Sequence, residues 1–196
     1  MSTVSLSRWT MSYFTAALFC LLAAEALMAL GYGFPGAPAG APATLVLVHL
    51  VALGWLSLRL CGALFQFVPV LVAKPLHDNE LPLPTLCCFG GGLALLLGGF
   101  LQLDGTIIAD WPLLPAGGTL LALGFTLVLY NLGRTLWTGR PLPLPARFVT
   151  AGLLSVAVAA GFGLTFTYVL GGVTVASPLI DATAAGLPLH IVAGLG

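Results

Sequence analysis

Four ionisable residues lie inside apolar segments of this 196-residue chain, and their types could do chemistry. They are Glu25, His49, Arg59 and His190. An ionisable side chain in lipid costs about 2.5–3.5 kcal/mol on insertion scales, so it usually has a partner or a task. Neutral imidazole is a common ligand of haem iron and copper, and a neighbouring carboxylate can orient the ring. We therefore expect His49 and His190 to be candidate cofactor or metal ligands, and Glu25 to be a candidate for orienting them.

Each of these residues also has a purely structural interpretation. His49 can be an interfacial histidine that bonds to a carbonyl or to water, and Glu25 can bond to a neighbouring helix. Arg59 lies ten residues after His49, about 15 Å along a helix, so direct contact is not expected. Glu25 and Arg59 differ in depth by about 12 Å, counted with the same rise per residue, so an ion pair between them would be strained. We expect the partner of Arg59 to lie on helices outside this chain.

The segment from His49 to Leu71 predicts two helix faces. Residues at i, i+4, i+7 and i+11 share one face of a helix. Here they are Trp55, Arg59, Gly62 and Gln66, and we call this face the intramembrane polar stripe. His49 lies about 100° away from this stripe on a regular α-helix. Gly62 would let another helix approach closely.

The composition places most of the chain in lipid. Only 6% of the residues are charged, whereas about a quarter of the residues of a soluble domain are charged. The mean hydropathy is +1.10. Six basic and six acidic residues cancel without forming a run, which removes the electrostatic case for nucleic-acid binding. The four cysteines have no metal-binding spacing. The lipid bilayer is thus the first expected partner.

The hydropathy pattern predicts an all-α integral membrane helical bundle, because a lipid-embedded chain must satisfy its own backbone groups. Residues 1–196 form a single transmembrane domain. Proline- and glycine-rich breaks separate five full spans. The predicted spans are Thr10–Leu30, Thr44–Val68, Leu86–Leu103, Leu113–Trp137 and Arg147–Leu170.

Charge and aromatic residues predict the orientation. Basic residues outside the spans fall on one side, which the positive-inside rule makes cytoplasmic, and the N-terminus lies there. We expect a bacterial inner-membrane location. The basic residues are Arg8, Lys74, Arg134, Arg140 and Arg147; Trp9, Tyr13, Trp111 and Trp137 are expected in aromatic belts near helix ends.

A truncated sixth helix is expected from Leu187 onward, because ten residues rise only about 15 Å. On this interpretation the chain is the N-terminal part of a larger polytopic protein. Glu25, His49 and His190 would all lie in the outer third of the membrane. The glycines at 90–92 and 98–99 predict close helix packing, Asn131 and Arg134 predict interfacial snorkelling, and His77 is expected to be solvated.

The stretch HLVALGWLSLRLCGALFQFVPVL resembles the second helix of subunit I in the haem–copper oxidase superfamily. The likeness is closest to the nitric oxide reductase and C-family cytochrome c oxidase branch. It rests on His49 near the outer face and on GALFQFVP at 62–69. The family's threonine–asparagine after this histidine is replaced here by Leu50 and Val51.

The resemblance implies that His49 is an axial ligand of a haem, with b-type haem expected. It implies that His190, at the start of the sixth helix, is a second metal or haem contact; copper would be possible only in a full-length parent. The family's remaining ligands lie on seventh and tenth helices, so the resemblance does not establish an enzyme. It favours a role in respiratory electron transfer, with other membrane subunits or a redox partner.

Two other classes remain open at this point. A permease or transporter fragment would use the broken connections and buried charges to line a substrate route. A structural or assembly subunit would use the same polar groups only to set helix order.

Overall fold

The computed structural model describes residues 8–173 and 177–195. The described residues form an all-α bundle without strands. Its five long apolar helices are each able to cross a membrane by length and composition, which defines an integral membrane protein. In chain order the elements are α1 (Arg8–Ala29), α2 (Pro42–His49), the π-helix η1 (Leu50–Ser57), α3 (Leu58–Val72), α4 (Pro82–Leu103), α5 (Leu113–Thr138), α6 (Leu144–Leu170) and α7 (Ser177–Leu195).

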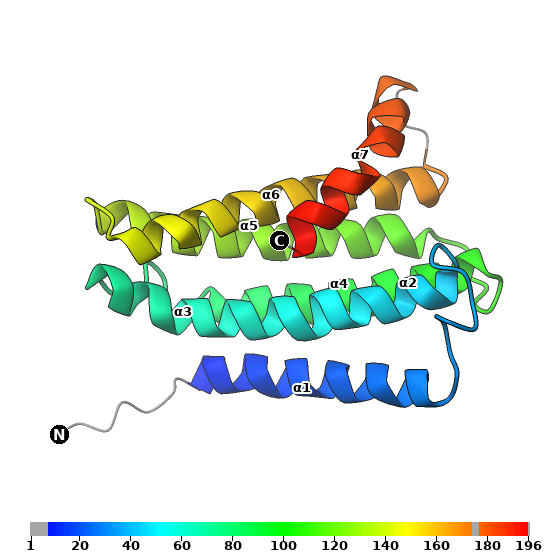
Figure 1. The fold of residues 1–196 in the computed structure, drawn as a ribbon, viewed down its shortest axis with the longest axis horizontal. Helices are drawn as coiled ribbons and strands as arrows, with labels where there is room; N and C mark the ends of the chain where they lie inside the picture. The colour runs from blue at the N-terminus through cyan, green and yellow to red at the C-terminus, as the bar shows by residue number, and fades with distance from the viewer. Residues whose placement is uncertain (1–7, 174–176, 196) are drawn as a thin grey trace.

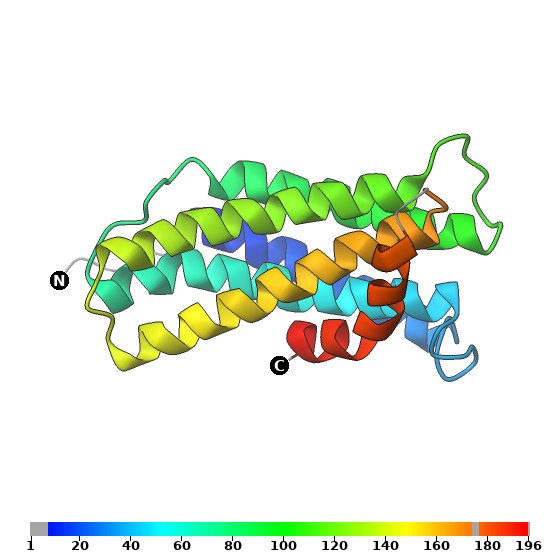
Figure 2. The same cartoon turned by 90° about the horizontal axis from the view of Figure 1, so that it is seen from above.

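The helices lie side by side along the length of the molecule (Figure 1). α1 forms one edge and packs on η1 and α3, while α4 joins this layer to α5. α5 and α6 lie next to each other along the other edge (Figures 1 and 2). We call the end that carries Arg8, Lys74, Arg140 and Arg147 the basic end, and the other end, with Asp104 and Asp110, the opposite end.

The second span is one continuous helical rod with a π-helical middle. α2, η1 and α3 run from Pro42 to Val72 without a break, and η1 follows directly after His49. The hydroxyl of Ser57 donates to the carbonyl of Ala52 at 2.8 Å, five residues earlier. π-helical turns are rare and occur often at functional sites. A π-helix turns less per residue than an α-helix, so the angle of 100° predicted between His49 and the Arg59 stripe does not apply.

Glycines bring α4 and α5 into backbone contact. A Cβ added at Gly99 would lie 2.7 Å from the backbone nitrogen of Leu114, and one at Gly117 would lie 2.5 Å from that of Leu96. Gly92 faces Gly117 in the same way. These contacts confirm the packing role predicted for the glycine runs, although an added Cβ at Gly90 meets nothing within 4 Å.

Gly62 provides the matching contact between α3 and α1. Its added Cβ would lie 2.6 Å from the Cβ of Tyr13, so the predicted close approach is confirmed. Tyr13 itself is fully buried, and its hydroxyl donates to the Pro82 carbonyl at 2.8 Å. Its expected place in an aromatic belt was therefore wrong. Burial against Phe65, in an edge-on ring contact at 5.7 Å, explains why.

The last helix differs from the expected one. α7 begins at Ser177, ten residues before the predicted start at Leu187. Pro188 lies inside the helix rather than in its first turn, and α7 bends as it returns along α6 (Figure 1). Its strongly apolar part is Ala185–Gly194, shorter than the five spans. A proline within a helix removes one backbone hydrogen bond, which accounts for the bend.

Replacing Gly117 with valine should destabilise the bundle by at least about 1–3 kcal/mol, because the new side chain would meet backbone atoms of α4 that cannot move aside. Thermal unfolding in mild detergent measures the effect. Gly90→Val on α4 is the control, since its Cβ enters open space. Equal melting temperatures for the two variants would contradict the role given to the glycine contact.

Candidate functional site

His49 is the last residue of α2, seven residues from the start of that helix at the opposite end. The side chain is partly buried. Its Nδ1 lies 2.8 Å from the carbonyl oxygen of Leu45, and its ring packs on Phe100 of α4 with centroids 4.9 Å apart. The seven residues correspond to about 10 Å of depth. The ring thus points toward a neighbouring helix at a fixed level.

His190 occupies a corresponding position on α7. Its Nδ1 lies 3.0 Å from the carbonyl oxygen of Ala159, and its ring packs edge-on against Phe166 at 5.3 Å. Gly163 lies beneath the ring, and a Cβ added there would be 3.2 Å from Cε1. Gly163 is seven residues from the end of α6, again about 10 Å in depth. The two imidazoles are therefore at similar depths.

The same hydrogen-bond pattern fixes the tautomer of both rings. A carbonyl oxygen only accepts, so Nδ1 must carry a proton in each histidine. In the neutral ring, Nε2 then carries the lone pair. Within the described residues no hydrogen bond reaches Nε2 of either ring. Each imidazole thus presents one nitrogen that can accept a proton or bind a metal.

The two rings belong to α2 and α7, helices that lie far apart in the sequence. His49 belongs to the group α1, α2, η1 and α4, which pack on one another. His190 belongs to α7, which packs on α6. The structure therefore places both histidines at similar depths on different helices, and their role as ligands stays a prediction.

Glu25 does not join them. It is an exposed residue of α1, while the neighbouring Ala24 is the residue that packs inward with Leu50. No hydrogen bond or ion pair connects Glu25 with either imidazole within the described ranges. Backbone carbonyls occupy the orienting position on both histidines instead.

Arg59 is also separate from the histidine pair. Its guanidinium lies 4.8 Å from the centroid of the Trp55 ring, and the side chain is exposed on α3. Gln66, two turns later, keeps its Oε1 buried without a hydrogen-bond partner in the described part of the chain. The expectation that Arg59 pairs with a helix outside this chain stays a prediction.

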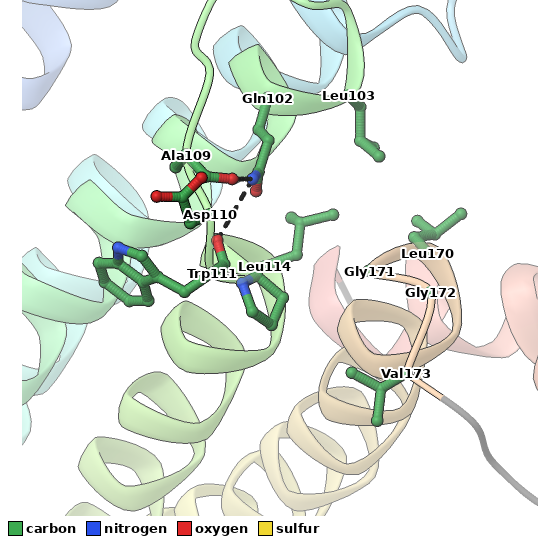
Figure 3. A pocket seen from close by; sticks show the side chains of 11 residues that line it. Gln102, Leu103, Ala109, Asp110, Trp111, Leu114, Leu170, Gly171, Gly172 and Val173 are labelled. Carbon is green, nitrogen blue, oxygen red and sulfur yellow. Dashed lines mark hydrogen bonds between the residues drawn. The ribbon is translucent and has the colours of Figure 1, made fainter.

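A pocket of about 350 Å³ opens at the opposite end between α4, α5 and α6 (Figure 3). Gln102 lines it and donates to the carbonyls of Ala109, at 2.9 Å, and Trp111, at 3.2 Å. Its Oε1 accepts from the Leu113 amide at 3.2 Å. The pocket contains neither histidine. Gln102 fastens the 104–112 loop, a role that sequence reasoning missed.

The carboxylate of Asp104 stabilises the start of the same loop. Its Oδ1 accepts from the Thr106 amide at 2.9 Å. The Thr106 side chain and backbone together hold the pKa of Asp104 below its usual range. The Asp104 carboxylate therefore stabilises the turn in which it lies.

Asn131 fastens a loop at the basic end. It is fully buried, accepts from the Asp78 amide at 2.9 Å and donates to the Asp78 carbonyl at 2.8 Å. The expected snorkelling of Asn131 was therefore wrong, because a buried amide needs internal partners. His77 is exposed, but it is held by Thr135 and by the Tyr130 hydroxyl, 3.2 Å from Nε2.

Among the described residues no group of three or more His, Cys, Asp or Glu side chains could hold a metal ion. The fold and composition place the chain in the class of polytopic α-helical membrane proteins. Comparison with protein-family models, curated proteins and solved structures finds no significant match.

Asn131→Leu should release the 77–80 loop, because it leaves both backbone groups of Asp78 without their partner. We expect a loss of about 1–3 kcal/mol in local stability. Hydrogen exchange at the Asp78 amide measures this opening. Arg134→Gln, an exposed change one turn away, is the control. Unchanged exchange in Asn131→Leu would show that the loop is held by other contacts.

Proposed function

We propose that this chain is a haem-binding integral membrane protein with a role in electron transfer, resembling subunit I of haem–copper oxidases. His49 would supply one axial nitrogen and His190 the second. The single observation that carries the proposal is the matched pair of imidazoles, each with Nδ1 bonded to a carbonyl and with no hydrogen bond to Nε2 from the described residues. A haem-ligating histidine needs this arrangement, since the bond at one nitrogen fixes the tautomer and orients the other.

The residues present fit a haem better than a metal ion held by protein alone. Haem iron needs at most two protein nitrogens, because the porphyrin supplies the other four. Each imidazole is packed against a phenylalanine, Phe100 or Phe166, which suits an apolar macrocycle. When bound, haem would supply a one-electron couple whose potential depends on ligands and burial.

The chain's own residues would then hold and insulate the group. The hydrogen bonds to the carbonyls of Leu45 and Ala159 would fix the tautomer and the orientation of both rings, so that Nε2 of each neutral ring presents its lone pair. Gly163 lets the His190 ring pack closely on α6, because a Cβ there would lie 3.2 Å from Cε1. The surrounding lipid and helices exclude water, which favours binding of an apolar cofactor.

Haem binding can be measured directly on the purified protein. We expect a Soret band in preparations from haem-replete cells, or after haem b is added to the apoprotein. His49→Ala and His190→Ala should each weaken haem affinity by at least about tenfold and shift the band, because one axial nitrogen is lost.

His77→Ala is the matched control, since this histidine lies in the 73–81 loop at the basic end and bonds to Tyr130. It should leave the Soret band unchanged. A preparation that neither contains haem nor binds it when added would refute the proposal. So would a band that survives in the double variant of His49 and His190.

A further inference from the structure

An apolar groove of about 300 Å³ lies between α5 and α6 near the basic end. Leu129, Gly133 and Leu136 line it from α5, and Leu153, Leu154 and Ala157 line it from α6. Its volume is at the lower limit of small-molecule sites, which span roughly 300–1,000 Å³. The lining is almost entirely carbon, so the groove suits part of a hydrocarbon chain.

The mouth of the groove is cationic and aromatic. The guanidinium of Arg140 lies 3.6 Å from the centroid of the Trp137 ring, and both residues line the groove. Arg147 does not line the groove but lies beside it, since its Nε donates to the carbonyl of Leu142, a lining residue, at 3.2 Å. The amino-terminal end of α6, which begins at Leu144, adds positive potential.

No ion pair joins Arg140 or Arg147 to a carboxylate within the described residues. Asp78 is held by Asn131, which lies two residues before Gly133 and therefore about 200° around α5. The Oδ1 of Asp78 accepts from the Glu80 amide at 2.7 Å, within the same loop. The charge at the groove mouth is thus not neutralised by the described carboxylates of the neighbouring loop.

We propose that this groove binds an anionic phospholipid of the adjoining leaflet. One acyl chain lies along Gly133 and Ala157, and the phosphate is held by Arg140 with Arg147 beside it. Arginine binds phosphate through charge-assisted and often bidentate hydrogen bonds. Trp137 lies at the headgroup level, where amphipathic rings are favoured. A zwitterionic lipid would fill the groove equally well but would present a weaker match to the two guanidinium groups.

Lipid retention by the purified full chain tests the site. The protein is exchanged in mild detergent with equal amounts of dioleoyl phosphatidylglycerol and dioleoyl phosphatidylcholine, and bound lipid is counted by native mass spectrometry. We expect an approximately tenfold preference for phosphatidylglycerol, as lost charge-assisted bonds would imply. Arg140→Gln should bring the ratio close to one. Lys74→Gln, which changes a cation of the same end outside the groove, should leave the ratio unchanged.

Variants that fill the groove provide a second test of the lipid site. A Cβ added at Gly133 meets nothing within 4 Å, so Gly133→Leu should occupy the groove without disturbing the helices and should lower retention of both lipids. Gly90→Leu, which also enters open space but on α4, should retain them. If leucine lowers the yield of folded protein, Gly133→Ala tests the same position.

Equal retention of the two lipids by the wild type would overturn the proposal. So would a preference that persists in Arg140→Gln, or lipid retention that Gly133→Leu and Gly133→Ala leave unchanged. Release of a protein fragment instead of lipid on exchange would identify the groove as a helix-docking surface and would likewise reject the lipid.

Discussion

The exclusion of water from most of the molecule is the constraint on which the structure depends. A polar group in hydrocarbon must find its partner within the protein, because lipid offers none. The backbone meets this demand by forming helices. Side chains meet it locally: the hydroxyls of Thr85, Thr119 and Thr126 donate to the carbonyl four residues earlier. His49 and His190 follow the same rule through Nδ1, and Nε2 of each ring has no hydrogen bond within the part of the chain that the structure describes.

Close glycine contacts then decide which helices become neighbours. Without a hydrophobic force between helices in lipid, association depends on packing, and small residues let backbones meet. Gly92, Gly99 and Gly117 join α4 to α5, and Gly62 joins α3 to α1. Gly118 similarly admits Thr167 of α6. These contacts set the lateral positions of α2 and α6, and hence the positions of His49 and of the surface on which His190 rests.

The proposed haem site and the proposed lipid site occupy different levels of the bundle. The histidine pair lies about 10 Å from the opposite end, whereas Arg140 and Trp137 lie at the basic end. Both sites use α6, which holds His190 through Ala159 and lines the groove through Leu154. Because the two proposals depend on different residues, each can be correct without the other.

The amide side chains show how far sequence reasoning extended into the sites. Hydropathy identified the spans but read Asn131 as an interfacial residue, because a single amide near a helix end is compatible with either water or a loop. Gln102 gave no signal for the same reason. Only the folded loops supplied their partners, at Asp78 and at Ala109 and Trp111. An amide one or two turns from a helix end, facing a short loop, is the signal that could have found them.

The sequence by itself determined the five spans, the two chemically different ends and the depth of the ionisable residues within those spans. These follow from hydropathy and from a rise of 1.5 Å per residue, which are properties of each segment taken alone. The tertiary structure decided which groups each side chain contacts: His49 and His190 bond to backbone carbonyls, while Glu25 is exposed. Lateral position depends on glycine contacts between segments and on the rotation introduced by η1, and neither can be read from one helix in isolation.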